Sequence, residues 1–69
     1  MKITLQHEDG LKVYYDTDRI AYIRHDKASN LYNKSDLAGN GIKATESVLV
    51  INFKNGECAT FGDDWSIIF

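Results

Sequence analysis

Residues 48–61 read VLVINFKNGECATF, and this stretch decides the fold class. Asn55-Gly56 separates two runs that are rich in β-branched and aromatic residues. An Asn-Gly pair in this setting is the strongest short-range signal for a β-hairpin, because a type I′ turn needs positive φ at both central residues. The sequence therefore predicts a hairpin over 48–61 with a two-residue loop.

A two-residue loop also fixes the register of this hairpin. It places Lys54 opposite Glu57, an opposite-charge pair worth about 0.2–1 kcal/mol. One face then carries Leu49, Ile51, Phe53, Cys58 and Thr60, and the other carries Val48, Val50, Asn52, Ala59 and Phe61. Because both faces are largely apolar, the hairpin needs cover on both sides, with Cys58 as a small apolar filler opposite Phe53.

The first 25 residues also have the period-two pattern of strands. Residues 3–6 and 11–16 alternate between apolar and polar side chains on either side of a polar turn at 7–10. Asp16, Thr17 and Asp18 could suggest a metal loop, but short polar side chains that bond to the backbone in a tight turn are the favoured interpretation. Ile20 and Ile23 are then expected to enter the core.

Two segments leave alternatives open. Residues 26–47 form either a long loop or hairpin arm, with 31–37 pairing with 42–48 across the Gly-Asn-Gly at 39–41, or a helix over 29–38. At the C-terminus, DDWSIIF predicts a short helical turn capped by Asp63 or Asp64. Its apolar stripe of Trp65, Ile68 and Phe69 either packs on the core or remains exposed for a partner.

These patterns together predict a single small domain over 1–69 that is mainly β. We expect an SH3-like barrel or a strongly bent antiparallel sheet of about five strands, with a short C-terminal helical turn. A chain of 69 residues buries only about 60% of its extended surface on folding, so it has little room for a deep cavity.

Several of these motifs resemble known bacterial families. They are ITL at 3–5, Gly10, VYYDTDRI at 13–20, Ile23 and a β-rich run that ends in FKNGE at 53–57. This layout resembles small β-proteins of the flagellar FlbD type and the strand-turn-strand and final hairpin of LytTR-type DNA-binding domains. The resemblance covers 3–24 and 48–61, and it implies a bent sheet or SH3-like barrel that acts in regulation through contacts, without catalysis. The chain differs from the FlbD pattern in its longer middle segment and in ending with DDWSIIF, so no functional residue is carried over.

Charge is distributed unevenly along the chain. Residues 19–43 contain five basic residues against two acids, whereas the rest contains three lysines against eight acids, for a net charge of −2. Arg24, Lys27, Lys34 and Lys43, interleaved with tyrosines, could contact phosphates and stack on bases, but a pI of about 5.5 is low for a nucleic-acid-binding domain.

The sequence carries no motif for catalysis, a cofactor or a metal. No serine or cysteine is paired with an evident base, and no glycine-rich phosphate loop follows a strand. The one cysteine cannot form an internal disulfide, and the first residues lack the apolar run of a signal peptide, so a reducing, cytoplasmic location is expected. No stretch approaches the roughly 20 apolar residues of a membrane span.

We therefore expect a non-catalytic module that binds another macromolecule, most of all a protein, in a regulatory or accessory role. Its small, free-standing format also suits phage or mobile-element inhibitors of host machinery. The alternatives are a nucleic-acid-binding β domain that uses the basic middle segment and, less favoured, a small enzyme or metal-binding protein. Self-association is a further expectation, because an open sheet has free edges. The predicted partner-binding residues are Arg24, Lys27, Tyr32, Lys34, Lys43, Trp65 and Phe69.

Overall fold

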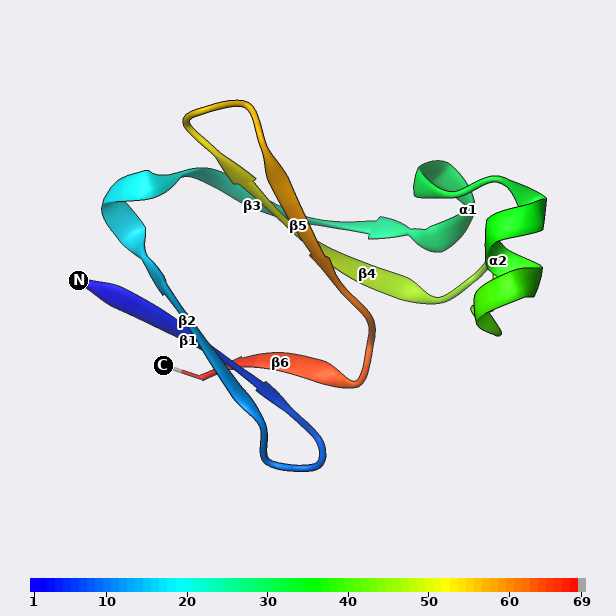
Figure 1. Cartoon of the computed structure of the whole chain (residues 1–69), viewed down its shortest axis with the longest axis horizontal. Helices are drawn as coiled ribbons and strands as arrows, with labels where there is room; N and C mark the ends of the chain where they lie inside the picture. The colour runs from blue at the N-terminus through cyan, green and yellow to red at the C-terminus, as the bar shows by residue number, and fades with distance from the viewer. Residues whose placement is uncertain (69) are drawn as a thin grey trace.

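The computed structural model describes residues 1–68 as two three-stranded antiparallel sheets and two short helices (Figure 1). The elements in chain order are β1 (Lys2–His7), β2 (Lys12–Asp16), a 3₁₀ turn (Thr17–Arg19), β3 (Ile20–Lys27), α1 (Ala28–Leu31), α2 (Lys34–Asn40), β4 (Ser47–Phe53), β5 (Cys58–Phe61) and β6 (Trp65–Ile68). One sheet has the strand order β2-β1-β6 and the other β3-β4-β5. The mainly β prediction is confirmed, but the sheets do not close into a barrel.

Both faces of β4 are covered, as its apolar pattern requires. On one face, Leu49 and Ile51 are buried with Leu5 of β1, so the first core lies between the two sheets. On the other face, Val48 and Val50 are buried against the helical segment. In Figure 1 the helices lie beyond one end of β3 and β4. The sheet of β1, β2 and β6 lies below the sheet of β3, β4 and β5 in the same view. The predicted two-sided cover is therefore found for β4, whereas β5 leaves Cys58 and Thr60 exposed on its outer face.

The register of this hairpin differs by one residue from the predicted one. Asn52 lies opposite Cys58, and the Phe53 amide donates to the Glu57 carbonyl at 2.9 Å. The loop has three residues, and only Gly56 has positive φ (+90°), because Asn55 keeps an ordinary backbone. This slip moves Phe61 to the face that packs on the inter-sheet core. Cys58 is exposed on the opposite face, so its predicted role as apolar filler is wrong.

The C-terminal segment forms a strand, so the predicted helical turn is wrong. β6 pairs antiparallel with β1, with Leu5 opposite Ile67 and His7 opposite Trp65. Trp65 and Ile67 pack on the inter-sheet core, whereas Ile68 points to the exposed side. Pairing with β1 satisfies the backbone hydrogen-bonding groups of this segment, and it buries two of its apolar side chains. A single helical turn would leave more of those backbone groups without partners. Phe69 lies outside the described residues.

The middle segment is helical rather than a hairpin arm. α1 and α2 replace the predicted single helix over 29–38, with a break at Tyr32 and Asn33. The Asn33 side chain accepts from the Asp36 amide at 2.8 Å and caps α2, and Gly41 ends it with φ +66°. Leu37 then reaches the second core. None of the helices in the described part of the chain is long and apolar enough to cross a membrane.

The 3₁₀ turn after β2 confirms the structural interpretation of its acidic residues. Asp16 Oδ1 accepts from the Asp18 amide at 3.1 Å, as expected for a polar cap. Ile20 packs on the inter-sheet core, but Ile23 is 37% exposed, so the prediction that both enter the core is half wrong. β3 is the edge strand of its sheet, and the core between the sheets takes in Ile20 without reaching Ile23.

Candidate functional site

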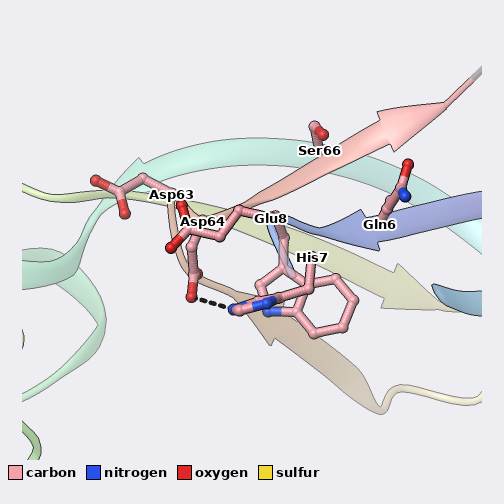
Figure 2. Close-up of a pocket in the computed structure, with 7 residues that line it drawn as sticks. Gln6, His7, Glu8, Asp63, Asp64 and Ser66 are labelled. Atoms are coloured by element: carbon pink, nitrogen blue, oxygen red, sulfur yellow. Dashed lines mark hydrogen bonds and ion pairs between the residues drawn. The ribbon is translucent and has the colours of Figure 1, made fainter. Parts of the chain in front are cut away.

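The first candidate site is a histidine held between two carboxylates. His7, at the end of β1, lies 2.6 Å from Asp64 through Nε2 and 2.9 Å from Asp9 through Nδ1. Figure 2 shows the His7 ring joined by a hydrogen bond to Asp64, which lies in the β5–β6 connection. The His7 and Trp65 ring centroids are 5.1 Å apart at 66°, an edge-to-face arrangement. The cluster borders an open depression of about 390 Å³.

These contacts determine the protonation behaviour of the cluster. The Asp64 hydrogen bond, followed by the Asp9 hydrogen bond, raises the pKa of His7 above its ordinary value. The Leu11 amide, which donates to Asp9, is the main cause that lowers the pKa of the Asp9 carboxyl, and His7 adds to it. His7 and Asp9 therefore each favour the charged form of the other.

The arrangement supports a structural tie better than a reaction centre. Both nitrogens of His7 already have partners in Asp9 and Asp64, including the Asp9 amide, which donates to Nδ1 at 3.2 Å, so neither nitrogen is free for a substrate. The Glu8 amide also donates to the Asp64 carbonyl at 3.0 Å, which joins the same two segments through the backbone. Among residues 1–68 no group of three or more histidine, cysteine or acidic side chains is placed to hold a metal ion.

The second candidate site is the open edge of β3. This strand has eight residues, the most of any strand in the described chain, and nothing pairs with it on the side away from β4. Ala21, Tyr22 and Ile23 are consecutively exposed, and Tyr22 is 57% exposed. An open edge with apolar side chains is a template for the addition of another strand.

The predicted partner-binding residues are only partly brought together. Arg24 lies opposite Val50, and Val50 lies opposite Thr60, whose hydroxyl accepts from the Tyr32 hydroxyl at 3.0 Å. Arg24 and Tyr32 therefore lie at opposite ends of one row of residues across the sheet, because Val50 and Thr60 lie between them. Arg24 Nη1 is ion-paired with Asp26 at 2.6 Å.

The three lysines are exposed, but they lie on separate elements. Lys27 ends β3, Lys34 begins α2, and Lys43 follows α2 in a depression that Glu46 and Asp63 also line. Trp65 is half-buried between His7 and Phe61, and Phe69 lies outside the described residues. The basic residues therefore form no continuous surface with the aromatic ones.

Comparison with known proteins adds no relative. No family model, curated protein or solved structure matches this chain. The resemblance to FlbD-type and LytTR-type proteins stays a prediction.

Sequence reasoning missed the residues that define both sites. His7 was expected in a polar turn, and a helix cap was the favoured interpretation of Asp64. Tyr22 and Ile23 follow Ile20 in an IAYI run that gives no sign of which side is covered. The signal that was available is the length of the run from 20 to 27, which contains no glycine, proline or asparagine and is longer than the usual strand of about five or six residues.

Proposed function

We propose that this chain is a non-catalytic protein-binding module whose contact element is the open edge of β3. The observation that carries the proposal is the exposure of Ala21, Tyr22 and Ile23 on an edge strand. Backbone groups at such an edge supply affinity by adding a strand, and the exposed side chains supply selectivity.

The other open edges support this role less well. β5 and β6 have four residues each, and β2 has five. In β2 every second residue is half-buried, and its outward side chains include the charged Lys12 and Asp16. Short edges and charged side chains are the usual protection against unwanted strand addition.

A nucleic-acid partner is the less supported alternative. Arg24 is already ion-paired with Asp26, and Lys27, Lys34 and Lys43 lie on separate elements. A phosphate backbone is bound by several cations acting together, with a steep dependence on salt. Retention on an oligonucleotide column that falls steeply with salt would favour this alternative.

The test is a photo-crosslinking comparison between two tyrosine positions. A benzophenone side chain replaces Tyr22 on β3 or, as a matched control, Tyr14 on β2; the two are 57% and 60% exposed, and each lies on an edge strand. The proposal expects protein adducts from position 22 and few from position 14 after irradiation in lysate of the source organism. Equal adducts at both positions, or none at 22, would contradict it.

A further inference from the structure

The β3 strand has a charge pattern that is complementary to itself. Arg24-His25-Asp26 places a cation before and an anion after a central histidine. When two such strands run antiparallel and centre on His25, each Arg24 faces Asp26 of the other strand. We infer that the partner at the β3 edge is a second copy of this chain, joined through an antiparallel β3–β3 ladder centred on His25. This inference rests on the proposed function.

The backbone of β3 is oriented for this ladder. The Ala28 amide donates to the Glu46 carbonyl at 2.9 Å, which is toward the β4 side. Because backbone groups alternate in direction along an antiparallel strand, those of Lys27, His25 and Ile23 point to the open edge. The Lys27 amide agrees, since it donates to the Asp26 side chain at 2.8 Å.

A ladder centred on His25 uses only these outward groups. The two His25 residues exchange their amide and carbonyl bonds, and on either side Ile23 of one copy pairs with Lys27 of the other. The backbone groups that point toward β4 keep their present partners. Joining the copies therefore requires one change in the existing sheet, which is that the Lys27 amide gives up its hydrogen bond to the Asp26 side chain.

Charge also excludes the neighbouring registers. A twofold axis perpendicular to the sheet must lie midway between two copies of the same residue, because only residues whose backbone groups point the same way can lie opposite each other in an antiparallel ladder. An axis at Arg24 would oppose two guanidinium groups, and an axis at Asp26 would oppose two carboxylates. An axis at Ile23 would set Asp26 against Ile20 and extend the ladder into the register irregularity between Ile20 and Tyr22. The centre at His25 is the register that pairs unlike charges within the regular part of β3.

The side chains at this edge gain from the pairing. Arg24 and Asp26 are 39% and 26% exposed and already ion-paired, so the second copy turns one pair into a network of four alternating charges. Ile23, 37% exposed, comes to lie opposite Lys27, whose aliphatic carbons can cover it. Because the ladder is short, we expect dissociation constants in the micromolar range, as for other small interfaces.

The test is charge complementation measured by sedimentation equilibrium over a range of protein concentrations. Arg24→Asp alone puts two acids opposite each other at both symmetric positions, and Asp26→Arg alone puts two cations there. Each single variant is expected to weaken self-association about tenfold. An equimolar mixture of the two variants pairs unlike charges again and is expected to form heterodimers of at least wild-type affinity. Lys12→Asp, which changes the net charge as much as Arg24→Asp but on β2, is the control and should leave the dissociation constant unchanged.

A second variant separates the interface from folding. Asp26 also accepts from Asn30 and from the Lys27 amide, so Asp26→Arg can loosen α1. His25→Asp leaves those bonds intact and opposes two carboxylates at the twofold centre; it should weaken the dimer while the circular dichroism spectrum stays that of the wild type.

The outcomes that overturn the inference are distinct from those that overturn the proposed function. A wild-type chain that stays monomeric to about millimolar concentration, or a variant mixture that associates no better than its components, ends the second-copy assignment. If position 22 still crosslinks a different protein, the binding function stands with another partner. If position 22 gives no protein adduct and the chain stays monomeric, both proposals fail.

Discussion

The core between the two sheets can be tested by removing one methyl group at Ile51. Ile51 is fully buried, and Ile23, directly opposite it on β3, is 37% exposed. Ile→Val in a packed core typically costs about 0.5–1.5 kcal/mol, because the lost transfer free energy is joined by the cost of the space left behind. Ile51→Val should therefore lower the free energy of unfolding by about 1 kcal/mol, and Ile23→Val by less than about half of that.

The assay is reversible denaturant and thermal unfolding followed by circular dichroism, at concentrations low enough to keep the chain monomeric. For a domain of this size, about 1 kcal/mol corresponds to a shift of about 4–8 °C in Tm. Valine is preferred to alanine at Ile51, because an alanine costing about 2–5 kcal/mol would remove much of the stability of a small domain. Equal losses at the two positions would show that the sheets do not meet over Ile51, and the account of the core would be wrong.

Two further predictions concern the His7 cluster and the hairpin loop. Because the pKa of His7 is raised in the folded state, its contribution to stability is present below the ordinary histidine pKa and is lost as pH rises through the raised folded value. Asp64→Asn should bring the pKa of His7, measured by NMR, back toward its ordinary value. A His7 titration that is unchanged in this variant would refute the structural tie between His7 and Asp64. Gly56→Ala should lower the free energy of unfolding by about 1–2 kcal/mol, because Gly56 has a φ of +90°. Gly39→Ala inside α2, where a Cβ also meets no neighbour, should raise the free energy of unfolding by up to about 1 kcal/mol. Denaturant unfolding that gives both changes the same sign would contradict this loop geometry.

The hairpin was predictable, but its register was not. Asn55-Gly56 fits both a two-residue loop, which needs positive φ at both residues, and a three-residue loop, which needs it only at Gly56. The choice between them depends on which side of the sheet Phe61 occupies. That side is decided by the second sheet, because Phe61 packs with Tyr15 and Trp65 on the inter-sheet core. Local sequence does not encode that contact.

The C-terminal strand was not predicted from the sequence for a related reason. A short run with Trp65, Ile67 and Ile68 fits a helical stripe as well as an alternating strand, since it is too short for either period to be decisive. Its pairing with β1 joins residues almost the whole chain apart, and His7 and Asp64 are 57 positions apart. The His7 cluster is a consequence of that pairing, so no reading that placed Asp64 in a helix cap could have found it.

The two-sheet arrangement explains why an open strand edge and a buried core occur together in so short a chain. Closing the strands into a barrel would remove the free edges, but here one face of β4 is covered by α1 and α2, and the other by β1, β2 and β6. The sheet β3-β4-β5 therefore ends at β3, which belongs to the sheet through β4 alone. Charged residues at its far end would normally protect such an edge from strand addition. In this strand the charges alternate as Arg24 and Asp26 about His25, so in the proposed dimer the pattern that repels strands in other registers would select a second copy of the chain in one register.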